Sequence, residues 1–137
     1  MPPEDAMERI NGILAHAWMV RTFLKHSDEA QADPEMLEVH RMIFDYCRAV
    51  EPAYQRRDAA EYLHRARGKF SKLKKQAEFF AANYRRVSDH TNFQMAALSL
   101  SGCVRQMEEV LAAVDGERRG VSPTCQENDV GESNDPR

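Results

Sequence analysis

The chain has 137 residues, of which 42% are hydrophobic and 30% charged, with 19 basic and 22 acidic side chains. This length suits one domain with one hydrophobic core and is too short for two ordinary domains. Abundant alanine, with only six glycines and six prolines, favours an all-α fold over a long all-β fold. The net charge of −3 excludes a protein that is basic overall, as general nucleic-acid coats are.

Several features predict a soluble cytoplasmic protein. The sequence has no stretch of about 18 apolar residues, so we expect no transmembrane helix and no membrane partner. The N-terminal residues lack the basic and apolar segments of a signal peptide. The three cysteines, Cys47, Cys103 and Cys125, are odd in number and widely spaced, unlike a disulfide framework.

Helical periodicity begins near the N-terminus. In residues 5–26, apolar side chains recur every three or four positions, which predicts an amphipathic helix. A polar link follows, and Asp33 with Pro34 then predicts a helix start, with Asp as N-cap and Pro at the first helical position. We expect this second helix to cover residues 34–50, with its end or a sharp bend at residues 51–52, because Pro52 disfavours helical geometry in the residue before it.

Two further helices carry apolar residues at heptad spacing. Asp58 and Glu61 have the spacing of a capping box and predict the start of a third helix over residues 58–86. The fourth helix is expected over residues 92–115, with Gly116 as the left-handed residue that ends it.

These elements predict an all-α domain, residues 1–115, with the architecture of an antiparallel up-down four-helix bundle. The alternative is a pair of helical hairpins whose core is completed by dimerisation. Residues 116–137 have two valines as their only aliphatic side chains and cannot bury enough apolar surface to offset the entropy of ordering. We therefore expect a disordered C-terminal tail.

A possible metal site lies on the inward faces of the predicted bundle. Aligning the helices at about 1.5 Å per residue puts His16, Cys47 and Cys103 in one layer, with His40 about two turns above Cys47. Imidazole and thiolate groups from facing helices can hold zinc tetrahedrally. The alternative is two buried cysteines and a hydrogen-bonded core histidine.

Arg21 is a charged residue near the centre of the first helix's apolar face. An isolated buried charge costs several kcal/mol, so the guanidinium needs water or a partner. Three interpretations remain open: a buried stem with a solvated head, a structural salt bridge, or an anion or ligand site inside the bundle.

The link before the fourth helix is rich in hydrogen-bonding side chains, among them Asp89, His90 and Asn92. Polar loops on a rigid scaffold often carry function, so this link is where we expect a surface ligand site. Helix capping, by Ser88, Asp89 and Thr91, is the alternative explanation.

Some apolar residues lie outside the main stripes. Trp18, Met19 and Phe23 extend beyond the stripe of the first helix, and Phe79 lies opposite that of the third. A second apolar face predicts a homodimer or a contact with a protein partner. A wide core stripe is the alternative.

Charge is unevenly distributed along the chain. Residues 56–75 hold eight basic side chains and two acidic ones, whereas residues 27–40 hold five acidic side chains and no basic one. A basic third helix could bind nucleic acid or an acidic partner. The alternative is an ordinary solvated helix face.

Two short patterns resemble known families. The segment Ala15-His16-Ala17-Trp18, followed by a hairpin with His40, resembles the chemoreceptor zinc-binding domain over about half of the chain. The resemblance implies a four-helix bundle with His and Cys zinc ligands, but the family's Cys-Leu-Gly-x-Trp segment and its closely spaced His pair are absent. Arg85 and His90 resemble the Arg-to-His motif of the all-helical HEPN ribonucleases, which implies RNA cleavage.

The sequence thus predicts a non-enzymatic helical bundle that acts through protein–protein contact, as a homodimer or an accessory subunit. A bundle that binds a metal or a small ligand is the first alternative. An RNA-cleaving helical protein is the second.

Overall fold

The expected all-α class is confirmed by a computed structural model, which describes residues 1–118 and contains no strand within them. Four long helices form most of the molecule, and two short helical segments lie in the links between them. The long helices are α1 (Pro3–Lys25), α3 (Pro34–Gln55), α4 (Ala59–Asn83) and α5 (Thr91–Arg118), and the short segments are α2 (Asp28–Gln31) and the 3-10 helix η1 (Tyr84–Arg86).

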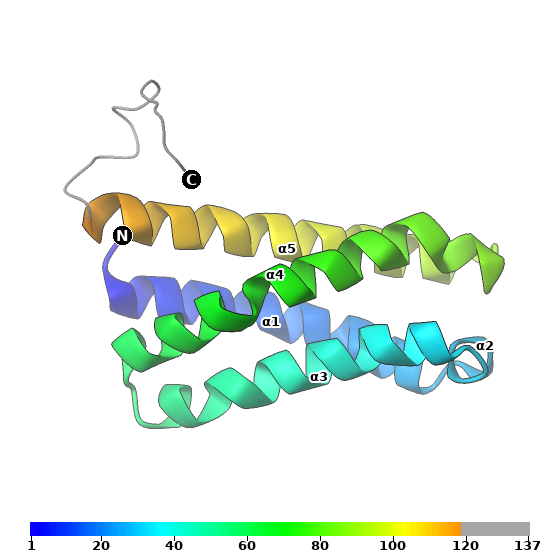
Figure 1. Ribbon diagram of the computed structural model, residues 1–137, viewed down its shortest axis with the longest axis horizontal. Coiled ribbons are helices and arrows are strands. Elements are labelled where there is room, and N and C mark those ends of the chain that lie inside the picture. Colours follow the sequence, from blue (N-terminus) through cyan, green and yellow to red (C-terminus); the bar gives the residue numbers. More distant parts are fainter. Residues whose placement is uncertain (119–137) are drawn as a thin grey trace, which may run out of the picture.

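The four long helices lie side by side along the long axis of the molecule (Figure 1). α1 packs against α3 and α5, and α4 packs against the same two helices. The short helix α2 lies at the end of the molecule opposite the N-terminus (Figure 1). Consequently each long helix presents one stripe to a shared core.

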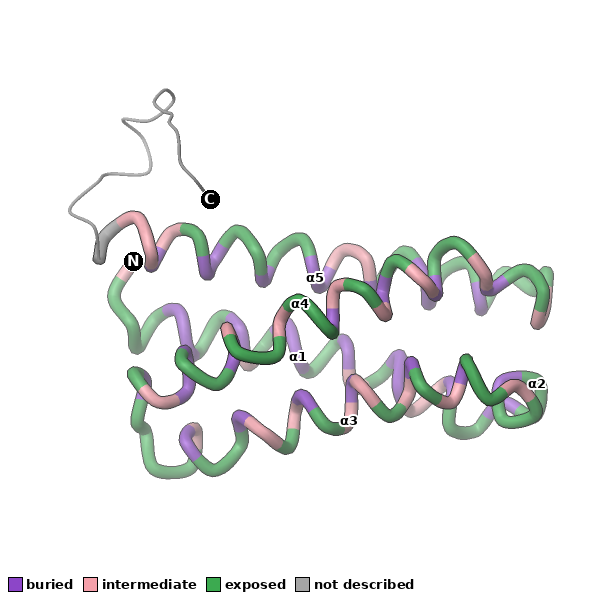
Figure 2. The backbone as a smooth tube through the Cα atoms, viewed as in Figure 1, coloured by how far each residue is buried: buried purple, intermediate pink, exposed green. Residues whose placement is uncertain are grey.

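Buried positions recur along every long helix (Figure 2). Their three- and four-residue spacing is the spacing that puts side chains on one helical face. The largest fully buried side chains come from all four long helices: Ile10, Leu24, Met36, Ile43, Tyr46, Tyr62, Leu73, Phe80, Leu100 and Met107. A single core therefore runs the length of the helices.

Helix starts follow the predicted capping residues. The Asp33 carboxylate accepts hydrogen bonds from the N–H groups of Glu35 and Met36, at 2.9 and 3.3 Å. The Asp58 carboxylate accepts the N–H of Glu61 at 3.1 Å. Both predicted N-caps are confirmed, because a side-chain oxygen satisfies N–H groups that lack a partner inside the helix.

The predicted end of the second helix at residue 50 is wrong, because α3 continues through Pro52 to Gln55. Tertiary contacts hold this last turn in place. Ala53 is buried, and the Tyr54 hydroxyl donates to the Glu8 carboxylate of α1 at 3.0 Å. Local disfavour of helix before a proline is thus outweighed by packing against α1.

A Schellman motif closes α3 without a glycine. The N–H of Arg57 donates to the Tyr54 carbonyl and the N–H of Asp58 to the Ala53 carbonyl, at 3.0 and 2.9 Å. Arg57 takes the left-handed conformation, with φ of 56°. Its guanidinium lies 4.5 Å from the Tyr54 ring centroid and pairs with Glu8. These contacts hold Arg57 in a conformation that glycine usually adopts at this position.

The other helix boundaries also differ from expectation. The third predicted helix, residues 58–86, divides into α4 and η1, and the polar link after α1 contains the single turn of α2. α5 passes through Gly116 and ends at Arg118, so the expected stop at residue 115 is wrong. Glycine only weakens a helix, and the Glu and Arg that follow it are good helix formers. The rest of the predicted tail, residues 119–137, lies outside the described residues.

Candidate functional site

A groove of about 400 Å³ lies between α1 and α3. Asn11, Leu14, Ala15 and Trp18 line it from α1, and Cys47, Arg48, Val50, Glu51, Tyr54 and Gln55 line it from α3. Its walls therefore combine aromatic and aliphatic surface with a few polar groups, which is the composition of many ligand pockets.

Arg21 does not line this groove but contacts Trp18, which does, and it is buried, with 8% of its surface exposed. Its guanidinium carbon is 4.1 Å from the centroid of the Trp18 ring and 5.1 Å from that of Phe44. The two rings are themselves 5.9 Å apart. The guanidinium is thus held against aromatic faces from two helices, an arrangement that stabilises a cation.

Helical spacing produces this cluster. Trp18 and Arg21 are one turn apart on α1, and Phe44 and Cys47 are one turn apart on α3. The two helices are in register, because Trp18 meets Phe44 just as Glu8 meets Tyr54 further along. The two apolar stripes therefore bring the cluster together without any loop.

Two buried nitrogen atoms near the cluster lack hydrogen-bond partners. The Nε atom of Arg21 and the Nε2 atom of His40 are buried, and neither makes a hydrogen bond within residues 1–118. No ion pair involves Arg21 in this part of the chain. The structural salt bridge considered for Arg21 is therefore not found among the described residues.

Burial sets the protonation of the neighbouring groups. Burial lowers the pKa of His40, and the charges of Arg21, Lys25 and Arg41 lower it further. Burial also raises the pKa of the Cys47 thiol to about 11, although the Arg21 charge opposes this rise. At neutral pH both groups are uncharged, so Arg21 supplies the charge of the cluster.

The four predicted zinc ligands are not brought together. His16 is exposed on α1, and Cys103 is buried where its Sγ donates to the Ile13 carbonyl at 3.6 Å. Cys103 thus meets α1 from the α5 side, whereas Cys47 lines the groove on the α3 side. No group of three or more His, Cys, Asp or Glu residues that could hold a metal is found within residues 1–118.

The predicted loop site at Asp89, His90 and Asn92 is exposed and is a helix cap. The His90 Nδ1 atom accepts the N–H of Asn92, and Ser88 Oγ accepts the N–H of His90, both at 3.0 Å. His90, rather than Thr91, therefore caps α5. The Arg85 guanidinium lies 5.2 Å from the Tyr84 ring centroid, so the residues of the ribonuclease motif both have structural contacts.

Two of the three predicted aromatic contact residues, Phe23 and Phe79, pack against the core. Trp18, Phe23 and Phe79 are each half-buried. The Phe23 ring contacts the Phe93 ring edge-on at 5.0 Å, and the Arg86 guanidinium covers Phe79 at 5.5 Å. A wide core stripe therefore accounts for Phe23 and Phe79. Trp18 instead lines the groove between α1 and α3.

Large apolar side chains are exposed elsewhere on α1 and α5. The exposed fraction is 63% for Met19, 53% for Met95 and 61% for Leu98. Sequence reasoning noted Met19 but missed the other two. Their positions off the heptad stripe of the fourth predicted helix were the available signal.

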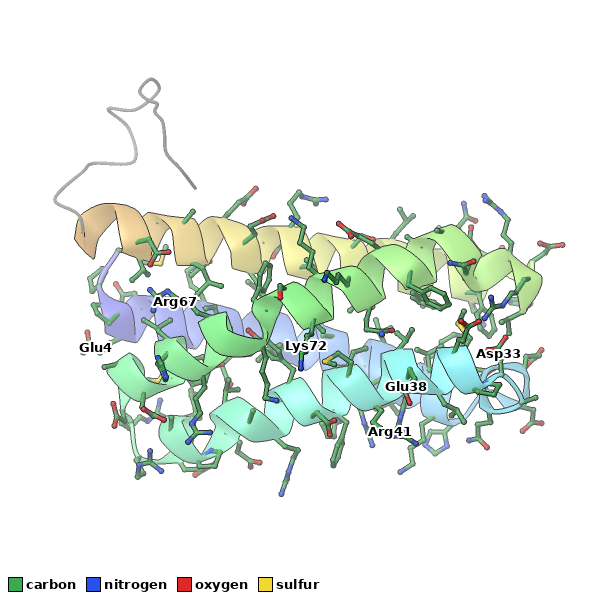
Figure 3. All side chains as sticks on the ribbon, in the orientation of Figure 1. Glu4, Asp33, Glu38, Arg41, Arg67 and Lys72 are labelled. Atoms are coloured by element: carbon green, nitrogen blue, oxygen red, sulfur yellow. The ribbon has the colours of Figure 1, made fainter. Side chains whose placement is uncertain are left out.

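Acidic partners neutralise much of the basic helix α4. Arg65 pairs with Glu61 on the same helix, at 2.7 Å. Arg67 and Lys74 pair with α5 carboxylates at 2.8 and 2.9 Å. Figure 3 shows Arg67 near one end of α4 and Lys72 between α4 and α3. These pairs favour the solvated-face interpretation of the basic helix.

Comparison of the chain with known protein families, curated proteins and solved structures found no match. The resemblances to the chemoreceptor zinc-binding domain and to HEPN ribonucleases thus gain no support, and no residue role is transferred from a relative. Within residues 1–118, no helix has the length and apolar character needed to cross a bilayer.

Proposed function

We propose that this protein is an antiparallel up-down four-helix bundle that acts through protein–protein contact, as a homodimer or as an accessory subunit, and not through catalysis. The exposure of Met19, Met95 and Leu98 carries this proposal. Large exposed apolar side chains gathered on one face mark interaction surfaces. Methionine is common on such surfaces because its flexible side chain adapts to a partner.

The register of α1 against α5 supports one shared surface. Phe23 contacts Phe93, and Ile13 contacts Cys103, so each step along α1 matches an opposite step along α5. By this register Met19 lies at the level of residue 97. At about 1.5 Å per residue, the exposed side chains of α5 are then within one helical turn of Met19 along the axis.

The directions in which these side chains point also agree with a shared surface on α1 and α5. Met19 precedes Phe23 by one turn and so lies on the side of α1 that meets α5. Met95 and Leu98 are three residues apart and share a face of α5. We therefore define the apolar patch as Met19, Met95 and Leu98, of which Leu98 also borders a hollow lined by Ala81 and Arg85 on the α4 side of α5. A second copy of the chain is the simplest partner, since a two-fold axis pairs a patch with itself.

Light scattering coupled to gel filtration tests this proposal. We expect a mass of twice the 15.7 kDa of one chain. Leu98→Glu places a charge in the patch and should weaken association at least about tenfold. Ala112→Glu is the matched control, because it adds the same charge at another exposed position of α5 and should leave the mass unchanged.

Two results would overturn the proposal. The homodimer is excluded if Leu98→Glu and Ala112→Glu associate as the parent protein does, or if the parent is monomeric up to about 1 mM. The accessory subunit is excluded if the parent protein is a monomer and a pull-down with it captures no protein that Leu98→Glu fails to capture.

A further inference from the structure

The hollow beside Leu98, between α4 and α5, has a volume of about 250 Å³. On α5 its lining residues are Gln94, Ala97, Leu98 and Ser101, so the exposed Leu98 lies near the middle of the hollow along the helix axis. A protruding side chain and a recess therefore lie at one level of the molecule. A surface of this kind can bind a second copy of itself.

The contacts between α4 and α5 define which of their residues lie at the same level. The two helices run in opposite directions: Lys74 pairs with Glu108 at 2.9 Å, and Arg85 lines the hollow together with Gln94. Between these contacts, Glu78 lies at the level of about residue 103 of α5, and Arg85 at that of about residue 94. Glu78 and Arg85 are thus about equally far from the level of Leu98, on opposite sides of it.

Glu78 and Arg85 are also exposed and oppositely charged. They are seven residues apart, so they share the side of α4 that borders the hollow. Neither makes an ion pair within residues 1–118. Lys74, one turn before Glu78, pairs with Glu108 instead. The Arg85 guanidinium stacks on the Tyr84 ring at 5.2 Å, which leaves its N–H groups available for an anion.

A two-fold axis that crosses α5 at Leu98 would satisfy all these groups. Such an axis makes the two copies antiparallel, so Leu98 of one copy lies at the level of the other copy's hollow. Glu78 then comes to the level of the partner's Arg85, and the reverse pair forms as well. An axis parallel to the helices would instead put Glu78 opposite the partner's Glu78, and like charges repel.

We propose that two copies of this chain bind antiparallel through α4 and α5, with Leu98 of each copy in the other copy's hollow and Glu78 paired with the partner's Arg85. This inference rests on the homodimer proposed above and adds its orientation and its polar contacts. Met19, at the level of residue 97, then lies close to the axis as well. Apolar contacts at the centre and charged pairs at the edge are the usual arrangement of an interface.

Sedimentation velocity of the full chain over a series of concentrations tests the orientation. Glu78→Arg places like charges opposite each other twice in the homodimer, and so does Arg85→Glu. Each variant should self-associate at least about fivefold more weakly than the parent protein. In an equimolar mixture of the two variants, every one of these pairs is again oppositely charged. The mixture should therefore associate about as tightly as the parent.

Asp45→Arg is the matched control. It makes the same change of charge at an exposed position of α3, which packs against α1 and α4 rather than against α5. This variant should associate as the parent does. Circular dichroism establishes that each variant remains helical, and rescue in the mixture separates lost pairing from lost contact between Arg85 and Tyr84.

Several results would overturn the orientation while the homodimer stands. One is that Leu98→Glu dissociates the dimer but neither charge reversal weakens it, as a parallel pair predicts. Another is that the reversals weaken association without rescue in the mixture, or that Asp45→Arg weakens it equally. A monomeric parent protein, in contrast, overturns the proposed homodimer itself and this inference with it.

Discussion

At the scale of single residues, we predict that His40 makes the stability of the protein depend on pH. Its Nε2 atom is buried without a partner, and burial, with the charges of Arg21, Lys25 and Arg41, lowers its pKa below the ordinary 6.5. The unfolded chain therefore takes up the proton first as the pH falls. Stability from the neutral imidazole is present above pH 6.5 and is lost as the pH falls toward the lower pKa of the folded state.

His40→Gln removes this titration. We expect the variant to lose less stability than the parent protein between pH 7 and pH 5, because it has no imidazole that the unfolded chain protonates more readily than the folded one. Urea unfolding at several pH values in that range measures the difference. Parallel curves for the two proteins would contradict the burial of a neutral His40.

Arg21 and Tyr46 show two ways of burying a polar residue in this core. The Tyr46 hydroxyl donates to the Ala66 carbonyl at 2.7 Å, so its hydrogen-bonding capacity is used inside the protein. Arg21 has aromatic faces instead and keeps an unpaired Nε atom. The first arrangement satisfies the polar group with a hydrogen bond between helices, whereas the second stabilises a cation through contact with aromatic rings.

At the scale of helices, Asp33 combines a cap with an ion pair. It caps α3, and its carboxylate pairs with Arg86 of η1 at 3.2 Å. Asp33→Asn keeps an acceptor for the cap, but Asp33→Ala does not. We therefore expect Ala to cost about 1 kcal/mol more than Asn in urea unfolding. Equal losses would show that the charge alone matters.

The ionisation of Asp33 also makes its contribution to stability depend on pH. The hydrogen bond from Arg86, assisted by the N–H groups of α3, lowers the pKa of Asp33 below its ordinary 3.8. Its ionised form contributes stability above that value, and the contribution is lost as the pH falls through the lower folded pKa. The difference in Tm between the parent and Asp33→Asn should shrink accordingly.

Pro52 tests how tertiary contacts override local preference. It lies inside α3, where it lacks the N–H that would donate to residue 48. Pro52→Ala restores this bond and should raise the free energy of unfolding by about 1 to 2 kcal/mol, after the greater entropy of the unfolded chain is counted. Urea unfolding measures the change.

Pro34→Ala is the control for this prediction. Pro34 lies at the first position of the same helix, where the missing N–H has no partner inside the helix. We expect no gain from this variant. If both substitutions change stability equally, the interior position of Pro52 does not matter.

At the scale of the whole molecule, α5 offers a matched pair of leucines. Leu100 is fully buried in the shared core, whereas Leu98, two residues earlier, is 61% exposed. Leu100→Ala should destabilise the protein by about 2 to 5 kcal/mol, because it leaves a cavity in the core. Leu98→Ala should change the unfolding free energy by less than about 0.5 kcal/mol when the chain is monomeric. Urea unfolding at low protein concentration compares them, and similar losses would contradict the assigned burial.

Much of the architecture was predictable from local chemistry. Apolar spacing predicted the long helices and the all-α class, and Asp33 and Asp58 predicted where two of them start. Helix ends were predictable only in part. Pro52 and Gly116 both indicate a stop locally, yet α3 and α5 continue past them. Propensity is a weak preference that packing can outweigh.

The candidate sites depended more on tertiary structure. The sequence placed Arg21, His40 and Cys47 on inward faces, because helical spacing alone decides which side chains share a face. Which faces meet is decided by packing between helices. That packing put Cys103 on the α5 side of α1 and Cys47 on the α3 side, so the predicted zinc ligands are separated.

For this protein, therefore, the sequence by itself determined the helical class, the two cap positions and the presence of a charge on an apolar face. Only the tertiary structure decided that this charge lies against the rings of both Trp18 and Phe44, with an unpaired Nε atom. It likewise decided which apolar side chains remain exposed on α1 and α5. The physical reason is that periodicity is local, whereas burial and pairing depend on residues far apart in the chain.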